Sequence, residues 1–371
     1  MSGASILYLA PNFLSYRLHK MIRGVEVFDL LLVRQLVELG HPVTVVADHS
    51  WRKRFEDLLA GATPEIMYTP SLRKPWLNGP VAEALLRGRR FSAMIVGNDN
   101  RGLLPTVKRL IRRGIADRRV LIAHRMPRDE YRARVQGVEI DVVAVNTQIA
   151  STFERVVNGR VQTRYGIVNA DEFYPATGAE ASDTVVKFCV LGKLDNEWKG
   201  AGQAIGVFRR LPARVRDSAE LHLVAYPTEQ HFVENNIYGS GWIAADRIPP
   251  LLRRMDVMLV LSKKEETFSQ AMVQGMLTAL PIIITDLPVL VEKLDAGGGV
   301  IVHNDEELGA AMTTLATDAV LRKRLGIQAR KTALERYVWD TKKFVEDVLF
   351  RSAESTPGPT RDEKRTVHTL V

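Results

Sequence analysis

The sequence predicts a two-domain α/β protein with doubly wound sheets. Apolar strands alternate with amphipathic helices along most of the 371 residues, which is the pattern of parallel sheets covered by helices. Residues 176–183 are small and polar without periodicity, and we interpret them as an interdomain linker. In the second half, a buried strand at 257–261 passes through a charged loop into a helix, and open α/β sheets bind ligands at such junctions.

The first domain is expected to span residues 1–175. A strand at 6–10 is followed by a loop that carries basic residues and ends at Gly24, and then by a helix that Gly40 terminates. Apolar runs and helical spacing then repeat this unit. Strands are expected at 42–47, 93–97, 120–123 and 141–145, with a helix at 103–115.

The second domain is expected to span residues 184–336. Its strands are predicted at 185–191, 221–224, 257–261 and 282–284, and its helices at 248–255, 306–316 and 321–337. A further helix is predicted from Phe268, Met272, Met276 and Ala279, which follow one another at spacings of four, four and three before Pro281. Residues 353–371 are polar and contain proline, so we expect a disordered tail.

Composition excludes several classes of protein. The hydrophobic content of 46% and charged content of 25% are those of a globular chain, and no apolar run reaches the length of about 18 residues that a membrane-spanning helix needs. The N-terminus lacks the basic start of a signal peptide. The single cysteine, Cys189, lies in an apolar run and excludes an internal disulfide. These features predict a cytoplasmic protein.

The net charge of +8 is concentrated near the N-terminus. Residues 1–141 hold 23 Lys and Arg against 14 Asp and Glu. One interpretation is an anionic acceptor, or peripheral contact with an anionic membrane at its inner face. The other is a solubilising surface, and composition does not separate the two. Nucleic acid is not an expected partner.

The absence of known motifs argues against P-loop nucleotide chemistry, a zinc site and a dinucleotide cofactor. The P-loop pattern is absent, and so are the histidine pairs of zinc hydrolases, so no metal and no cofactor are expected. The run Gly200-Ala201-Gly202-Gln203-Ala204-Ile205-Gly206 resembles a dinucleotide fingerprint. However, its third glycine is one residue late and eight residues separate it from the strand, so a dehydrogenase is disfavoured.

The stretch from Glu266 to Pro281 resembles a known family. It reads E-T-F-S-Q-A-M-V-Q-G-M-L-T-A-L-P, and many family 4 glycosyltransferases, the glycogen-synthase-like group, have E-G-F-G-(L)-x-x-x-E-A-M-A-x-G-x-P here. Glu266, Phe268, Met276 and Pro281 fall on the pattern. Gln274 stands at the second glutamate, and the glycines correspond to residues 267, 269 and 279.

Other motifs of that family follow in order. Residues 192–200 (GKLDNEWKG) resemble G-R-x-x-x-x-K-G, residues 163–175 resemble the phrase that closes the first domain, and Tyr337-Val338-Trp339 resembles F-S-W. The resemblance spans residues 5–350 and implies the GT-B fold. In this fold two Rossmann-like domains face each other across a cleft, and the segment 337–352 crosses back to the first domain as a helix.

The resemblance also implies a function. A retaining glycosyltransferase moves a sugar from a UDP- or GDP-linked donor to a hydroxyl of a glycan, a lipid-linked sugar or a natural product, without a metal. The catalytic residues implied are Glu266, His124, Lys199 and Lys193. Donor-binding residues are expected at Gly24, Gly192, Lys193, Lys199, Trp242, Ile243, Glu266, Thr267, Phe268, Ser269 and Gln274. Acceptor-binding residues are expected at Asn12, Arg17, His124 and Arg125.

The chemistry of these residue types fits the implied reaction. Lysines and the N-terminus of a helix favour the anion that forms as a diphosphate leaves. Glu266 would hold sugar hydroxyls. Gln274 replaces a carboxylate at the position expected to reach the ribose, and an amide cannot form the charged pair. Two alternatives remain: a GT-B protein that binds without catalysis, and an epimerase or phosphorylase on the same fold.

Overall fold

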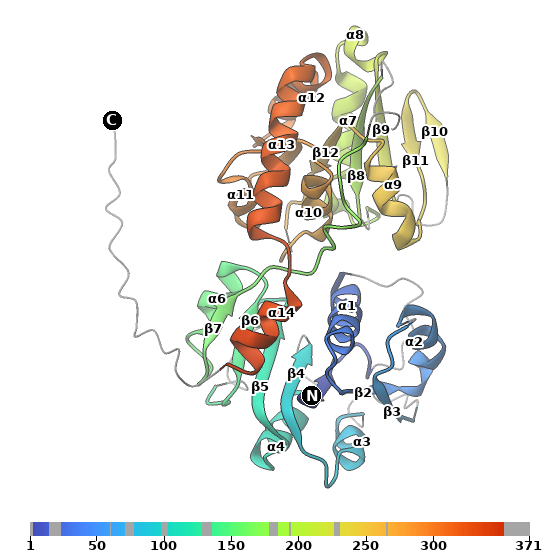
Figure 1. Ribbon diagram of the computed structural model, residues 1–371. Coiled ribbons are helices and arrows are strands. Elements are labelled where there is room, and N and C mark those ends of the chain that lie inside the picture. The colour runs from blue at the N-terminus through green and yellow to red at the C-terminus, as the bar shows by residue number, and fades with distance from the viewer. Residues whose placement is uncertain are drawn as a thin grey trace, which may run out of the picture.

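Two parallel-stranded sheets form the core of the protein (Figure 1). The computed structural model describes residues 3–14, 24–59, 61–70, 78–97, 103–127, 136–177, 185–192, 194–225, 231–264 and 266–351. The linker expected at 176–183 and the tail expected at 353–371 therefore fall wholly or mostly outside the described residues. No helix in the described part of the chain is long and apolar enough to cross a membrane.

The N-terminal sheet has seven strands, all parallel, in the order β3-β2-β1-β4-β5-β6-β7. The strands are β1 (Ile6–Leu9), β2 (Val43–Asp48), β3 (Glu65–Thr69), β4 (Phe91–Gly97), β5 (Ala116–Ala123), β6 (Asp141–Ala144) and β7 (Val161–Thr163). The helices are α1 (Gly24–Glu38), α2 (Arg52–Leu58), α3 (Asn78–Leu85), α4 (Leu104–Arg112) and α6 (Thr147–Phe153), with a 3₁₀ turn, η1, at His49–Trp51. The central strands are almost entirely buried because helices and loops cover both faces of the sheet, whereas the edge strands β3 and β7 are only partly buried.

The C-terminal sheet also has seven strands, in the order β10-β11-β9-β8-β12-β13-β14. The strands are β8 (Val186–Leu191), β9 (Ala219–Val224), β10 (Phe232–Glu234), β11 (Ile237–Gly239), β12 (Val257–Val260), β13 (Ile282–Thr285) and β14 (Gly299–Val302). Only the edge strand β10 runs antiparallel to its neighbour. The expected alternation of strands and helices is confirmed, whereas β3, β7, β10 and β11 were not expected because they are short or only partly buried.

The C-terminal half is richer in helices. They are α7 (Ala201–Arg210), α8 (Ala213–Arg216), α9 (Ile248–Leu252), α10 (Gln270–Leu277), α11 (Pro288–Leu294), α12 (Asp305–Thr317) and α13 (Ala319–Arg336), with 3₁₀ turns η4 (Glu197–Lys199) and η5 (Ala245–Arg247). The expected helical spacing was too generous at α10: Phe268 precedes the helix and Ala279 follows it. Met272 and Met276 lie within it, fully buried.

The chain returns to the N-terminal sheet at its end. After α13, the helix α14 (Thr341–Phe344) and the π-helical turn η6 (Val345–Leu349) lie against the N-terminal half (Figure 1). Phe344 and Leu349 are fully buried in a cluster that also contains Phe28 of α1 and Val120 of β5. Residues 341–349 thus complete the core of the first half.

Candidate functional site

A cleft of about 360 Å³ lies between the carboxyl ends of the two sheets. The N-terminal half contributes residues that follow β1 and β5 and those that open α1, and the C-terminal half contributes the loops after β8 and β12 and the start of α10. Among the sequence-predicted site residues, the cleft brings together Asn12, Gly24, His124, Arg125, Gly192, Lys199, Glu266, Thr267, Phe268 and Ser269. Segments far apart in the sequence therefore converge here, as expected for strand ends of doubly wound sheets.

The other sequence-predicted residues that the structure describes do not line this cleft. Gln274 lies in α10, half-buried and one turn beyond its start, and its contact with a ribose stays a prediction. Ile243 is half-buried and Trp242 is 41% exposed in the segment after β11, and their expected role in donor binding stays a prediction. Arg17 and Lys193 fall outside the described residues, as does Glu265, the neighbour of Glu266.

Lys199 and Glu266 form an ion pair at the C-terminal wall of the cleft. The Lys199 Nζ donates to Oε1 of Glu266, whose side chain is only 8% exposed. The Ser262 hydroxyl donates to the same oxygen at 2.7 Å. Ser262 is itself buried, so the loop that follows β12 holds the Glu266 carboxylate from two sides.

Backbone geometry explains why Lys199 reaches Glu266. Gly200 follows Lys199 with a φ of +82°, a conformation that glycine adopts without strain. A Cβ at this position would lie 2.6 Å from the Leu261 carbonyl oxygen, so only glycine allows η4 to pack against the end of β12. The Lys263 amide also donates to the Trp198 carbonyl at 2.8 Å. These contacts join the two loops that present the ion pair.

The start of α10 supplies backbone dipoles beside this pair. Ser269 is the N-cap residue with φ +59° and ψ +70°, and Gln270 and Ala271 open the helix against the cleft. Amide N–H groups of the first helical turn have no partner within the helix, and the helix dipole adds positive potential there. A cation and a helix N-terminus at one wall of a cleft form an arrangement that binds an anion such as a phosphate.

Ser269 and Ala279 keep backbone conformations that glycine prefers. Ala279 has φ +61° after α10, where its amide donates to the Met276 carbonyl and the next amide, of Leu280, donates to that of Gly275. These two bonds define a Schellman motif, whose left-handed residue is usually glycine. The backbone at both positions therefore matches the glycines of the glycosyltransferase pattern although the residues differ.

His124 occupies the N-terminal wall at the end of β5. Its side chain packs edge-on against the Phe28 ring, with centroids 4.6 Å apart. Burial, with a smaller contribution from Arg125, lowers the pKa of His124 to about 3. The imidazole is therefore neutral at physiological pH. Its Nε2 is buried and has no hydrogen-bond partner among the residues that the structure describes.

A buried carboxyl lies behind this wall. Asp29 of α1 accepts a hydrogen bond from the Tyr8 hydroxyl at 2.6 Å. Burial raises the pKa of Asp29 to about 8, the Tyr8 bond opposes this, and Glu26 adds to it. Asp29 is thus protonated over most of the physiological range. Sequence reasoning missed it because an acidic residue within an apolar helix face carries no motif.

Lys293 of α11 is fully buried beneath the Glu266 loop. Its Nζ donates to the Val289 carbonyl at 2.9 Å and lies 5.0 Å from the Phe268 ring centroid. The rings of Tyr165 and Tyr337 lie within 6 Å of the same amine. Burial lowers the pKa of Lys293 to about 8, against the opposing effect of Glu292 and Glu266. A lysine in a helix gives no sequence signal for such burial.

Three contacts join the Glu266 loop to the N-terminal half. Asn146, which follows β6, donates through Nδ2 to the Thr267 carbonyl at 2.5 Å. Gln270 donates to the carbonyls of Gly24 and Ile167 at 3.3 and 3.4 Å. Phe268 packs on Gly166, where a Cβ would lie 2.7 Å from the ring. Sequence reasoning identified neither Asn146 nor Gln270, because their partners lie 103 or more residues away.

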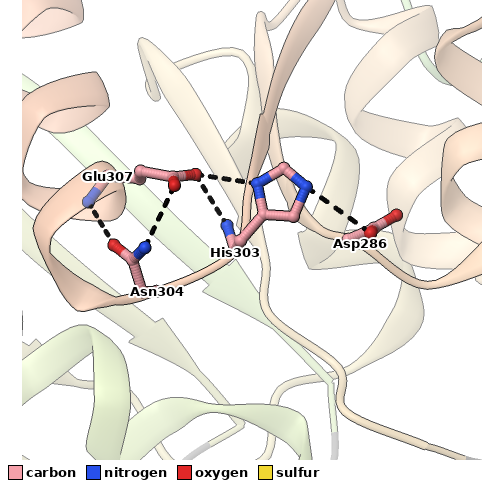
Figure 2. Close-up of polar contacts among 4 residues, drawn as sticks. All are labelled: Asp286, His303, Asn304 and Glu307. Atoms are coloured by element: carbon pink, nitrogen blue, oxygen red, sulfur yellow. Dashed lines mark hydrogen bonds and ion pairs between the residues drawn. The ribbon is translucent and has the colours of Figure 1, made fainter.

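Outside the cleft, the loops after β13 and β14 carry a polar cluster (Figure 2). His303 pairs with Glu307 at 2.9 Å and with Asp286 at 3.5 Å, and Asn304 caps α12 by accepting from the Glu307 amide at 2.8 Å. Glu307, with help from Asp286, raises the pKa of the exposed His303. No group of three or more metal-ligating side chains suited to an ion occurs among the described residues.

Comparisons with known proteins agree with this geometry. The family model "Glycosyl transferases group 1" matches residues 186–318, which run from β8 to the end of α12. No curated protein sequence matches. The matched part is about a third of the chain, and it contains Lys199 and Glu266.

Solved structures match the whole architecture. Alr3699/HepE from Anabaena, in complex with UDP-glucose, has 17% identity and a TM-score of 0.66, over 90% of this chain and 96% of that one. A glycosyltransferase from Rickettsia africae has 14% identity and a TM-score of 0.72, over 95% and 100%. WaaG, a glycosyltransferase of lipopolysaccharide biosynthesis, has 14% identity and a TM-score of 0.67, over 93% and 99%. The chain thus has the two-domain GT-B fold.

Proposed function

We propose that the protein is a nucleotide-sugar glycosyltransferase of family 4. The observation that carries the proposal is the pairing of Lys199 with Glu266 at the N-terminus of α10, inside the interdomain cleft of a GT-B fold. The match of residues 186–318 to a glycosyltransferase family and the UDP-glucose bound by a structural neighbour support it. The donor proposed is a UDP- or GDP-linked sugar, and the acceptor is a hydroxyl.

The proposed reaction is a retaining transfer without a metal. The bond between the sugar C1 and the diphosphate oxygen breaks, and the acceptor oxygen forms a bond to C1 on the same face. The acceptor proton passes to the departing diphosphate, which leaves as the nucleoside diphosphate. Charge develops on the diphosphate oxygens, so a cation and backbone N–H groups aimed at them lower the barrier.

The C-terminal wall would stabilise the leaving group. The Lys199 amine and the amides that open α10 face the cleft and would contact the diphosphate, together with Lys193 from the loop after β8. Glu266, held by Ser262, would accept hydrogen bonds from sugar hydroxyls and orient the ring. A carboxylate shared between a lysine and a serine is already fixed in direction, which reduces the cost of positioning the sugar.

The N-terminal wall would bind the acceptor and the neutral part of the sugar. His124 is neutral, so it exchanges hydrogen bonds with a hydroxyl rather than pairing with a charge. Arg125 is exposed at the rim, and Asn12 lines the cleft near it. Anionic groups on an acceptor would meet Arg125, with Arg17 as the further candidate.

Some basic residues among the first 141 pair with acidic residues of the same segment, which leaves the excess of basic over acidic residues unchanged. Arg89 pairs with Glu65, Arg90 with Asp117, and Arg113 with Glu83. We propose that the protein is cytoplasmic and contacts the inner face of an anionic membrane peripherally. This proposal rests on the remaining excess of positive charge in the first 141 residues. Binding to anionic vesicles that falls with salt would support it, and no binding at low salt would remove it.

A panel of sugar nucleotides tests the activity. The protein is incubated with UDP-, GDP- and ADP-sugars, with and without EDTA, and release of the free nucleoside diphosphate is measured alongside a thermal-shift screen. We expect one nucleotide series to raise the melting temperature and to be consumed in the presence of EDTA. Stabilisation without consumption would favour the binding-protein alternative. Conversion of the donor into another sugar nucleotide, without release of the free nucleoside diphosphate, would favour an epimerase.

A further inference from the structure

Asn146 makes two different hydrogen bonds at the boundary of the two halves. Its Oδ1 accepts from the Ile149 amide at 2.7 Å and so caps α6. This bond fixes the orientation of the amide, because the oxygen must face the helix. The Nδ2 then faces the opposite way and donates to the Thr267 carbonyl at 2.5 Å. The side chain is 3% exposed, so water does not compete for either bond.

The donor loop is held from both sides. Glu266 bonds to Lys199 and Ser262 of the C-terminal half. The next residue, Thr267, bonds to Asn146 of the N-terminal half, and Gln270 reaches two carbonyls of that half as well. The Glu266 carboxylate and the Thr267 carbonyl, which accepts the hydrogen bond from Asn146, therefore belong to adjacent residues. A change in the distance between the two halves must therefore move the backbone that carries Glu266.

Helix capping alone does not explain an asparagine at this position. The N-caps of α13 and α14 are Asp318 and Asp340, which accept a hydrogen bond and donate none. Asn304 caps α12 in the same way as Asn146, but its Nδ2 donates to Glu307 of its own helix at 3.0 Å (Figure 2). The donor group of Asn146 is thus the feature that capping does not require, and it is directed across the interface.

We infer that Asn146 is a positioning residue that ties the Glu266 loop to the N-terminal domain, so that closure of the two domains sets the geometry of Glu266. The expected effect on turnover rests on the proposed transfer reaction. The hydrogen bond from Asn146 to Thr267 is observed independently of that reaction. In the closed arrangement Asn146, Gly166 and Gln270 hold the loop against the N-terminal half. Donor binding to the C-terminal half alone leaves the loop without these three contacts.

The test uses substitutions that keep the cap and remove the donor. Asn146→Ser retains a capping oxygen but is too short to reach Thr267, and Asn146→Asp keeps the shape while placing an oxygen against the Thr267 carbonyl. Asn304→Ser is the matched control at a cap remote from the cleft. Two properties are measured for each full-length variant: kcat and KM with the donor identified by the panel, and hydrogen–deuterium exchange of the peptide spanning 262–271.

We expect kcat to fall about 10-fold in Asn146→Ser and further in Asn146→Asp, because small displacements of positioning groups carry large rate penalties. The dissociation constant for the nucleoside diphosphate should change by less than about 3-fold, since its proposed contacts lie in the C-terminal half. Exchange of the loop peptide should accelerate in both variants. Asn304→Ser should leave kcat and loop exchange at wild-type values.

Each outcome decides the inference. Wild-type loop exchange and kcat in both Asn146 variants would overturn it. Faster loop exchange in a protein that consumes no sugar nucleotide would uphold the tie and refute the transfer reaction. If the Asn146 variants do not fold, Gln270→Met replaces them, because it removes another donor that joins this region to the N-terminal half and leaves the α6 cap intact. Faster loop exchange in Gln270→Met then supports the tie, and unchanged exchange overturns it.

Discussion

The two walls of the cleft carry ionisable groups in opposite electrical states. On the C-terminal wall, Lys199 and Glu266 form an ion pair beside a helix N-terminus. On the N-terminal wall, burial keeps His124 neutral, and it keeps the Asp29 carboxyl behind that wall protonated up to a pH of about 8. Among the described residues of the N-terminal wall, Arg125 at the exposed rim and the buried Glu26 also line the cleft.

This difference suggests which wall serves which part of the proposed reaction, the departure of the diphosphate or the binding of a hydroxyl. Charge that develops on a leaving diphosphate is stabilised by fixed cations and dipoles, which only the C-terminal wall offers in depth. A hydroxyl needs a neutral hydrogen-bonding partner that costs little to desolvate, which the N-terminal wall offers. The same fold therefore provides an ion pair on one wall and a neutral imidazole on the other, and variants can be chosen that change one wall at a time.

The largest effect is expected at Glu266. Glu266→Gln preserves the shape and the Ser262 contact but removes the negative charge, so hydroxyls of the sugar lose a strong acceptor and Lys199 loses its partner. We expect kcat/KM for nucleotide release to fall by about 10³-fold. Glu307→Gln, an exposed substitution in the same half, is the control and should retain activity. More than a tenth of wild-type turnover in Glu266→Gln would remove the proposed role.

Lys199→Gln is expected to have the next largest effect. The substitution removes the cation that faces the diphosphate, and loss of one such group from a preorganised site costs about 10²-fold in kcat. Lys263→Gln, four residues along the chain from Thr267 and exposed, is the control. Steady-state kinetics with the donor at saturation separate the two variants. If Lys199→Gln weakens only KM, the lysine binds the ground state rather than the leaving group.

A pH series distinguishes the buried groups of the N-terminal wall. The pKa of Asp29 is raised from its unfolded value to about 8, so the folded chain holds a proton there that the unfolded chain has released. Between about pH 4 and 8 this term makes the free energy of unfolding decrease as the pH rises, by about 1.4 kcal/mol per unit. Asp29→Asn should flatten this slope in chemical denaturation.

His124 should change the free energy of unfolding with pH in the opposite direction, which provides an internal check. Its pKa is depressed to about 3, so below about pH 6.5 the unfolded chain binds a proton that the folded chain does not. Stability is therefore lost as the pH falls through this window, and His124→Gln should reduce the loss. Identical pH profiles for wild type and both variants would show that neither group is as strongly desolvated as the structure indicates.

The smallest effect is expected on the C-terminal side, at the end of α10. Ala279→Gly relieves a left-handed conformation at a Schellman position. The gain is partly offset by the greater freedom of glycine in the unfolded chain, so we expect the protein to become more stable by about 0.5–1 kcal/mol. Thermal unfolding of Ala279→Gly against wild type measures this. A lower melting temperature would contradict the assignment of strain.

The sequence predicted the sheets and the charged wall because both depend on local patterns. Buried parallel strands are continuous apolar runs, and Lys199 and Glu266 each follow such a run by a few residues. The start of α10 was predicted two residues too early, because the spacing of Phe268 suggested a helix that in the structure begins at Gln270. The helix therefore places residue 274 away from the cleft-lining turn.

The neutral wall and the interdomain ties could not be predicted in the same way. Asp29 and Lys293 are ionisable residues whose burial depends on packing by distant elements, and their local sequence does not differ from that of a solvated helix face. The sequence around Asn146 is typical of a helix N-cap, and Asn146 does cap α6. Because capping already explains the asparagine, the sequence gives no indication of its second hydrogen bond, to Thr267. Contacts between residues far apart in the chain leave no periodic trace.

The return of residues 341–349 to the first sheet has a consequence for biosynthesis. Phe344, Val345, Val348 and Leu349 fill the same apolar cluster as Phe28, so the first half lacks part of its interior until the ribosome has added almost the whole chain. During most of its synthesis, the nascent chain would expose the apolar surface that residues 341–349 later cover, and chaperones act on such exposed surfaces. A truncation before residue 341 should therefore aggregate, even though it would retain every strand of both sheets.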